Sequence, residues 1–285
     1  MIKIFLPGLA PFEPEFLTFN GGEEHVNLGP ASILRDYTAQ IVVKAKLKTS
    51  ADILRLLLTT NALRLLYPNP ITLNMPYVPY ARQDRACTEG DAFSFEVFAE
   101  LINAQKYSSV QVVDLHSYVA AALIKRVSEM PQDAFAYSTQ LCLHSEFKDT
   151  PQFIIAPDAG ASKKAFTFAQ RIGSFMDEQP ETVQALKVRN KNGAITSTNV
   201  LYDDFAGGSV LIVDDICDGG RTFIELARVL KAKNAGNIYL FVTHGIFSQG
   251  IEPLLESGIK HVFTTDSWYA GEYAGLGVTI VHNFF

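Results

Sequence analysis

The sequence is short of cysteine, of long apolar runs and of clustered positive charge, and each shortage excludes a class of protein. Three cysteines, Cys87, Cys142 and Cys217, stand far apart in 285 residues, so no disulfide framework is expected. No apolar run approaches the ~18 residues of a membrane-spanning helix. Lys and Arg number 24 against 30 Asp and Glu, which gives a net charge of −6 without a basic stripe. A nucleic-acid partner, which needs clustered cations against phosphates, is therefore not expected.

The same features predict where the protein works. The widely spaced cysteines are typical of reduced thiols in a cytoplasmic protein. The opening stretch, MIKIFLPGLA, is too short and too interrupted by proline for a signal peptide. We therefore expect a cytoplasmic protein that acts on neither a membrane nor a nucleic acid.

Hydrophobic residues make up 48% of the sequence, enough for a sizeable core, and they fall into short runs of two kinds. Continuous apolar runs predict strands that are covered on both faces, at residues 40–47, 69–77, 109–116, 152–160, 209–215, 237–244 and 261–267. Runs with i, i+3, i+4 apolar spacing predict helices, at residues 50–67, 93–105, 161–173, 220–236 and 250–258. Strand–helix–strand order predicts an α/β fold with right-handed crossovers.

Length and rhythm favour two domains of the same kind. A chain of 285 residues is long for one domain. The strand–helix rhythm of the first half recurs in the second, and the polar stretch 144–152 lies between them. We predict two similar α/β domains with central parallel sheets, residues 1–145 and residues 146–285.

Polar residues follow the predicted strands at the points where these end. Asp114 and His116 follow VQVV, Asp158 follows FIIAP, Asp214 and Asp215 follow VLIV, and His244 follows LFVT. In open parallel sheets, ligands bind beyond the carboxyl ends of the strands. One such aspartate could be only a helix cap, but several polar groups at one edge indicate a binding site. For His244, a packed position is favoured over a ligand role.

Residues 210–222, VLIVDDICDGGRT, join a buried strand to two carboxylates and a glycine turn. Gly219 and Gly220 allow a tight turn that presents backbone N–H groups, and the following helix offers its positive N-terminal end. These groups form an anion cradle, while Asp214 and Asp215 suit sugar hydroxyls or a metal ion. A sugar phosphate with neighbouring hydroxyls satisfies both halves. The alternative is a tight strand-to-helix turn with an aspartate cap and no ligand.

This motif resembles the phosphoribosyl-diphosphate binding signature shared by type I phosphoribosyltransferases and ribose-phosphate pyrophosphokinases. The first half of the chain distinguishes these two groups. MPYVPYARQDR (75–85) is similar to the ATP-binding stretch of the pyrophosphokinases, and VVDLHS (112–117) to their metal-binding strand end. FNGGEEHVNL (19–28) resembles the loop that holds adenine in that family.

Two matches in the second half complete the resemblance. APDAG (156–160) is similar to the metal-binding aspartate of the family's second domain, and THGIFS (243–248) to a later strand end. The matches occur in family order across residues 1–268. The chain is thus identified as a member of the ribose-phosphate pyrophosphokinase family, which implies two similar phosphoribosyltransferase-like, Rossmann-like domains, the first for ATP and the second for the ribose phosphate.

The resemblance implies a Mg²⁺-dependent transfer of the β,γ-diphosphoryl group of ATP to the anomeric hydroxyl of ribose 5-phosphate, which gives phosphoribosyl diphosphate (PRPP) and AMP. Arginines, a lysine and Mg²⁺ suit this chemistry, because it needs positioning and neutralisation of spread negative charge. By resemblance, ATP would be bound by Phe19, Glu23, Arg82, Gln83 and Arg85, metal by His116 and Asp158, and the sugar phosphate by Asp214, Asp215, Asp218, Gly219, Gly220, Arg221 and Thr222, with Lys187, Arg189 and His116 as catalytic groups. The family works as dimers assembled into hexamers, with adenine held across a subunit boundary, so a homo-oligomer is expected.

Two stretches depart from the family pattern. The family's phosphate loop usually reads Asp-Thr-Gly-Gly-Thr, whereas residues 218–222 read Asp-Gly-Gly-Arg-Thr, which removes a hydroxyl and adds a long cation. The segment after ARQDR, usually basic, carries Glu89 and Asp91 and no Lys or Arg. A cradle with Gly219 and Arg221 would suit a more extended group on the 5-oxygen, such as a diphosphate. Ribose 5-phosphate is the leading acceptor, and the terminal ribose of ADP-ribose, used in rebuilding NAD⁺, is the alternative.

Two functions of other classes stay open. A phosphoribosyltransferase would consume PRPP without ATP, and the ATP-type stretch PYARQDR argues against it. A non-catalytic regulator associated with a synthase would tend to have lost metal and sugar ligands, but His116, Asp158, Asp214 and Asp215 are all present. Release of AMP from Mg-ATP and a sugar phosphate would discriminate between the three functions.

Overall fold

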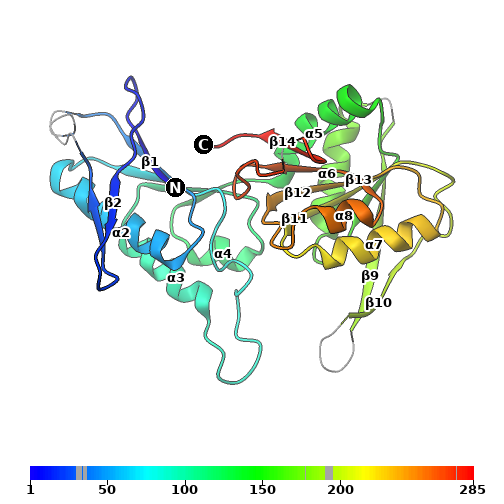
Figure 1. The fold of residues 1–285 in the computed structure, drawn as a ribbon, viewed down its shortest axis with the longest axis horizontal. Helices are drawn as coiled ribbons and strands as arrows, with labels where there is room; N and C mark the ends of the chain where they lie inside the picture. Colours follow the sequence, from blue (N-terminus) through cyan, green and yellow to red (C-terminus); the bar gives the residue numbers. More distant parts are fainter. Residues whose placement is uncertain (30–33, 35–36, 177, 190–194, 274) are drawn as a thin grey trace. The chain divides into compact units, whose positions relative to one another are not determined.

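The computed structural model describes residues 1–285 apart from 30–33, 35–36, 177, 190–194 and 274, and at residues 187–189 and 195–197 it describes the backbone alone. The chain divides into two compact units, Met1–Met130 and Pro131–Phe285. In Figure 1 the first unit runs from blue to green and the second from green to red. Both units are of the α/β class, as the sequence predicts.

The first unit is built on a sheet whose described strands have the order β1-β4-β5-β6-β7. The strands are β1 (Ile2–Phe5), β4 (Ile41–Ala45), β5 (Ile71–Asn74), β6 (Ser109–Val113) and β7 (Val127–Met130), and the helices between them are α2 (Ser50–Leu66), α3 (Ser94–Ala104) and α4 (Tyr118–Leu123). Strands β4 to β7 are parallel, and β1 is an antiparallel edge strand. The predicted helices at 50–67 and 93–105 are confirmed.

A small hairpin of the first unit is bound to helix α2. The hairpin consists of β2 (Glu15–Thr18) and β3 (Glu24–Asn27), which pair antiparallel. Arg55 on α2 donates from Nε to Oε2 of Glu24 at 2.7 Å and from Nη2 to Oε1 at 3.1 Å. Two parallel N–H···O bonds fix the planar guanidinium against the carboxylate, so the hairpin has a defined orientation on α2.

The second unit contains a larger sheet, in which the described strands follow the order β10-β9-β8-β11-β12-β13-β14. The strands are β8 (Phe153–Ala156), β9 (Glu181–Arg189), β10 (Ile195–Val200), β11 (Val210–Cys217), β12 (Ile238–Gly245), β13 (Ile259–Thr265) and β14 (Val278–His282). The helical elements are the 3₁₀ turn η1 (Gln132–Phe135), α5 (Ala136–Cys142), the π-helical turn η2 (Leu143–Phe147), α6 (Ser162–Gly173), α7 (Arg221–Ala232) and α8 (Glu252–Glu256). All pairings are parallel except that of β10 with β9. Every residue of β12 is buried, which agrees with its unbroken apolar run.

The division between the units falls after Met130, not after residue 145 as the sequence suggested. Residues 132–147 form helical turns that pack on the second sheet. Phe135 lies 6.3 Å from Phe241 between ring centroids, and Phe147 lies 5.4 Å from Tyr239. The polar stretch 144–152 therefore lies within the second unit, because Phe147 packs against Tyr239 of β12.

Asp149 ties together the amino ends of the strands in the second sheet. Its Oδ1 accepts from Ser209 Oγ at 2.8 Å, and its Oδ2 accepts from Tyr239 Oη at 2.8 Å and from Asn237 Nδ2 at 2.5 Å. Burial alone would raise the pKa of Asp149, but these hydrogen bonds, with one from the Thr150 N–H, lower it. The charged carboxylate is thus stabilised in the folded state.

Among the described residues, no helix has both the length and the hydropathy that a bilayer crossing requires.

We expect Asp149→Asn to lower the free energy of unfolding at pH 7 by about 1.5–3 kcal/mol, the value of a hydrogen bond to a charged group. Because the folded pKa lies below the unfolded value of ~3.9, this stabilisation is present above that pH and is lost as pH falls through the folded pKa. Urea unfolding of wild type and variant between pH 7 and pH 3 measures it. Asp203→Asn, an exposed aspartate of the same unit, is the control. Curves that differ by the same amount at every pH would contradict the account.

Candidate active site

The carboxyl end of β11 carries two adjacent carboxylates. β11 lies between β8 and β12, and its residues 210–213 are fully buried. Asp215 is 7% exposed and Asp214 is partly buried. The Asp215 N–H donates to Oδ1 of Asp214 at 3.0 Å. The buried strand therefore fixes both aspartates at the edge of the sheet.

Three carboxylates influence one another at this edge. Burial raises the pKa of Asp214 well above its usual value, and the neighbouring carboxylates of Asp215 and Asp158 raise it further. The carboxyl groups of Asp158, Asp214 and Asp215 are therefore close enough at this edge to affect the ionisation of Asp214. Such a site suits hydroxyl groups that donate hydrogen bonds, or a cation that neutralises the charge.

Gln132 supports the same strand end and was not among the predicted site residues. Its side chain is 3% exposed. Nε2 donates to the Asp214 carbonyl at 2.6 Å and to Thr243 Oγ1 at 3.2 Å. The sequence around it carries no motif, so only the folded structure reveals this contact.

The glycine turn after β11 leads into α7. Gly220 is the N-cap of α7 and has φ +74°, and a Cβ there would lie 3.0 Å from Leu254. Gly219 lacks this restriction, since the nearest atom to a Cβ is 3.6 Å away. Cys217 is buried, and burial followed by the charges of Asp214 and Asp218 raises the pKa of its thiol. It fills space at the end of β11, and the raised pKa disfavours the reactive thiolate form.

Arg221 and Thr222 begin α7 beside the turn. Arg221 Nε donates to Glu225 Oε1 at 2.8 Å, one helical turn further along. The added cation therefore has an anionic partner on its own helix, which reduces the charge it offers to a ligand.

Asp158 follows β8 and precedes α6. Its Oδ1 accepts from the Ala161 N–H at 3.2 Å, and Ser162 Oγ donates to its carbonyl at 3.3 Å. The bond to Ala161 lies just before α6, whose N-cap makes no side-chain hydrogen bond, so Asp158 is not a cap of that helix. The same carboxylate contributes to the raised pKa of Asp214. The structure thus brings Asp158, Asp214 and Asp215 to one edge of the second unit.

His116 lies beyond β6 in the first unit, on a turn with unusual backbone geometry. Asp114 has φ +43° and is 1% exposed, and its N–H donates to Met130 O at 2.9 Å. The Leu115 N–H donates to Oε1 of Glu129 at 2.9 Å. A non-glycine residue in this conformation is strained, so these bonds hold the turn that exposes His116.

The residues predicted for ATP lie on two exposed segments of the first unit. Arg82, Gln83 and Arg85 stand between β5 and α3, where the Phe95 N–H donates to Gln83 O at 3.3 Å. Phe19 and Glu23 stand at the tip of the β2–β3 hairpin, where the Phe19 N–H donates to Glu23 O at 2.8 Å. Phe19 is 49% exposed, so its ring is available for stacking.

The acidic segment after Arg85 forms a turn that is held by hydrogen bonds within the segment. Oδ2 of Asp91 accepts from the Cys87 N–H at 3.2 Å and from the Thr88 N–H at 2.9 Å. These bonds lower the pKa of Asp91. The carboxylate thus organises a compact turn where the family usually has a basic loop.

Two predicted residues are not placed. Lys187 and Arg189 belong to β9, where the structure describes their backbone but not their side chains.

His244 is 2% exposed, and its Nδ1 lies 2.8 Å from Ser267 Oγ. Its packed position agrees with the prediction.

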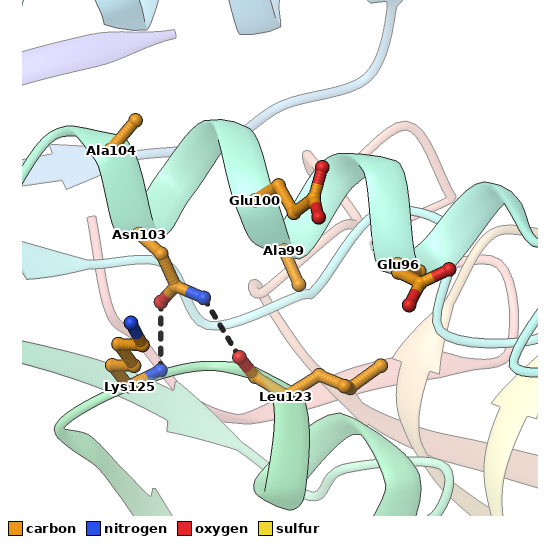
Figure 2. A pocket seen from close by; sticks show the side chains of 7 residues that line it. All are labelled: Glu96, Ala99, Glu100, Asn103, Ala104, Leu123 and Lys125. Atoms are coloured by element: carbon orange, nitrogen blue, oxygen red, sulfur yellow. Dashed lines mark hydrogen bonds between the residues drawn. The ribbon is translucent and has the colours of Figure 1, made fainter.

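A pocket of about 430 Å³ lies elsewhere on the first unit, between α3 and the end of α4 (Figure 2). Its lining residues are Glu96, Ala99, Glu100, Asn103, Ala104, Leu123 and Lys125. Asn103 Nδ2 donates to Leu123 O at 2.8 Å, and Asn103 Oδ1 accepts from the Lys125 N–H at 2.8 Å, as the dashed lines show. None of the predicted site residues lines this pocket.

No group of three or more His, Cys, Asp or Glu side chains forms a metal cage in the part of the chain that the structure describes. Mg²⁺ does not need one, because it keeps several waters and binds one or two carboxylates plus substrate phosphates. The charge gathered around Asp158 and Asp214 provides hard oxygen donors of this kind. The residues present therefore fit a hard divalent cation such as Mg²⁺.

Comparison with known proteins identifies the family. The N-terminal domain of ribose phosphate pyrophosphokinase matches residues 8–105, and the phosphoribosyl synthetase-associated domain matches residues 183–269. The ribose-phosphate pyrophosphokinase of Bradyrhizobium diazoefficiens is 30% identical over 241 residues, which span 82% of this chain and 71% of that protein. The chain belongs to the ribose-phosphate pyrophosphokinase family. The ribose-phosphate pyrophosphokinase of Thermosipho africanus is 28% identical over 256 residues, 87% of this chain and 76% of that protein.

The fold has a counterpart among solved structures. The phosphoribosylpyrophosphate synthetase of Mycobacterium smegmatis aligns with a TM-score of 0.78, over 95% of this chain and 86% of that one, at 21% identity. The predicted fold of two phosphoribosyltransferase-like domains with central parallel sheets is confirmed.

We expect Gly220→Ala to destabilise the turn by about 1–2 kcal/mol, because an alanine Cβ is unfavourable at positive φ and would also press on Leu254. Gly219→Ala is the matched control, since its neighbours leave room for a methyl group. Chemical denaturation of the two variants gives the difference in unfolding free energy. Equal destabilisation by both substitutions would contradict the geometry assigned to this turn.

Proposed function

We propose that this chain is a ribose-phosphate diphosphokinase, which transfers the β,γ-diphosphoryl group of Mg-ATP to the anomeric hydroxyl of ribose 5-phosphate and releases AMP and PRPP. The observation that carries the proposal is the end of β11, where Asp214 and Asp215 stand directly before the glycine turn of α7. Carboxylates that accept from the ribose hydroxyls and N–H groups that bind the 5-phosphate recognise the two ends of one molecule.

ATP is assigned to the first unit. Arg82 and Arg85 would bind its phosphates, with Gln83 between them, and exposed guanidinium groups suit this role. Phe19 and Glu23 would hold the adenine at the hairpin tip. In an assembly of identical subunits, these two residues would serve the site of a neighbouring copy, so we propose a homo-oligomer, a dimer or a hexamer.

The transfer step is assigned to charge stabilisation. Lys187 and Arg189 on β9 would stabilise the negative charge of the moving diphosphoryl group. His116 and Asp158 are each proposed as a ligand of Mg²⁺, which would supply positive charge against the nucleotide phosphates. The turn held by Glu129 fixes His116, and the start of α6 fixes Asp158.

Ribose 5-phosphate is the acceptor that the relatives favour, because they are named ribose-phosphate pyrophosphokinases. ADP-ribose, the alternative suggested by Arg221, is not favoured. The ion pair of Arg221 with Glu225 gives that guanidinium a role without a second phosphate.

The direct test mixes the protein with Mg-ATP and ribose 5-phosphate and measures AMP and PRPP by mass spectrometry. Both products should form, and neither should form without the acceptor. A parallel reaction with ADP-ribose tests the alternative, and one with PRPP and a base but no ATP tests a phosphoribosyltransferase. Lys187→Ala should lower turnover about 10²-fold or more, the scale of losing one transition-state stabiliser. Absence of every expected product under all these conditions would indicate a non-catalytic protein.

The sugar carboxylates give a second prediction. Asp214→Asn and Asp215→Asn should raise the KM for ribose 5-phosphate at least about ten-fold, because a hydrogen bond to a charged acceptor contributes roughly 1.5–3 kcal/mol. The KM for ATP should change little. Initial rates with each substrate varied in turn separate the two effects, and Asp203→Asn is a control with the same change at an exposed position. A selective rise in the KM for ATP would contradict the assignment of these two aspartates to the sugar.

A further inference from the structure

The hairpin of β2 and β3 presents different residues on its two faces. Among the described strands it forms a sheet of its own, apart from the main sheet of the first unit. Thr18 lies opposite Glu24 in the register, and the tip between them begins with Phe19 and ends with Glu23. The ring of Phe19 lies 5.9 Å from the ring of His25, which follows Glu24 on β3 and therefore points to the other face.

The face of the hairpin that carries Glu24 is bound to α2 by Arg55. Besides the two bonds from Arg55, the Glu24 carboxylate accepts from Thr18 Oγ1 at 3.0 Å, and its side chain is only 7% exposed. Arg55 Nη2 also lies 3.4 Å from Thr18 Oγ1, and the guanidinium carbon lies 5.5 Å from the centre of the Phe16 ring. One arginine therefore contacts both strands of the hairpin.

The helix on the other side of this contact has a fixed position. Helix α2 starts with a capping box between Thr49 and Asp52, and it buries Leu56 and Leu63 in the core of the first unit. A two-stranded hairpin, by contrast, is marginally stable by itself. The fork of Arg55 and Glu24 therefore links a rigid helix to a segment whose orientation depends on its contacts.

We propose that Arg55 is a positioning residue for the nucleobase of ATP, which orients the hairpin on α2 so that Phe19 and Glu23 are presented for binding. The inference rests on the proposed function, in which these two residues hold the adenine. Arg55 acts through Thr18 and Glu24, the chain neighbours of Phe19 and Glu23. Without the fork the hairpin would adopt other orientations, and the apparent affinity for ATP would fall with the fraction that keeps the binding one.

Initial rates of AMP release, with ATP and ribose 5-phosphate varied in turn, test the proposal. Arg55→Met keeps an unbranched side chain but removes the fork, so it should raise the KM for ATP about ten-fold, as when about one hairpin in ten keeps its orientation. The KM for ribose 5-phosphate should not change. Glu24→Gln weakens the fork from the other side and should act in the same direction. Arg64→Met is the matched control on α2, because Arg64 donates to the carbonyls of Gln105 and Lys106 instead, and it should keep the wild-type KM for ATP.

The decisive comparison repeats Arg55→Met in a protein that also carries Phe19→Ala and Glu23→Ala. The KM for ATP should then not rise further, because the side chains that Arg55 positions are absent, whereas a merely structural effect would persist. A rise of the same size in this background, an unchanged KM for ATP in Arg55→Met, or an equal rise in both KM values overturns the proposal.

Failure of the proposed function would show differently. The wild-type protein would then release no AMP, or the protein with Phe19→Ala and Glu23→Ala would keep the wild-type KM for ATP. Either result would remove the adenine from the hairpin tip, and the role of Arg55 would fall with it.

Discussion

The parallel pairing of β11 with β8 and β12 is the constraint on which the candidate site depends. Val210 lies opposite Phe153 on one side and Ile238 on the other. Because the three strands run in one direction, their carboxyl ends share an edge, and whatever follows each strand meets there. Asp158 follows β8, Asp214 follows the fully buried residues 210–213 of β11, and the loop after β12 reaches the glycine turn through backbone hydrogen bonds. The apolar core of the second unit therefore positions the polar groups of the site.

Sequence patterns predicted this arrangement where a local signal was strong. Unbroken apolar runs located β11 and β12, and helical spacing located α2 and α7, because burial imposes a period on the sequence. The antiparallel hairpin of β9 and β10 and the helical turns at 132–147 were missed. Their positions depend on contacts with distant residues, such as that of Phe135 with Phe241, and these contacts leave no periodic pattern.

The supporting residues of the site could not be predicted for the same reason. Gln132 acts through the Asp214 carbonyl, 82 residues further along, and Arg55 through Glu24, 31 residues earlier. Nothing in the residue types next to either side chain indicates its partner. Sequence reasoning located charged groups in motifs, but the hydrogen bonds that orient those groups arise only from the tertiary fold. The ion pair of Arg221 with Glu225 is of the opposite kind. Its two residues are four positions apart on one helix, a spacing at which side chains are neighbours, so the sequence itself indicates the contact.

The pKa values of carboxylates at the two ends of the second sheet are shifted in opposite directions. At the amino ends of the strands, Asp149 accepts hydrogen bonds from Ser209, Asn237 and Tyr239, and its pKa falls. At the carboxyl ends, burial and neighbouring carboxylates raise the pKa of Asp214. A raised pKa means that the charged form is disfavoured in the folded protein, so this edge costs stability, whereas the opposite edge contributes it. Hydroxyl groups or a cation at the carboxyl ends would relieve this cost, whereas at the amino ends the protein's own hydrogen bonds already stabilise the carboxylate.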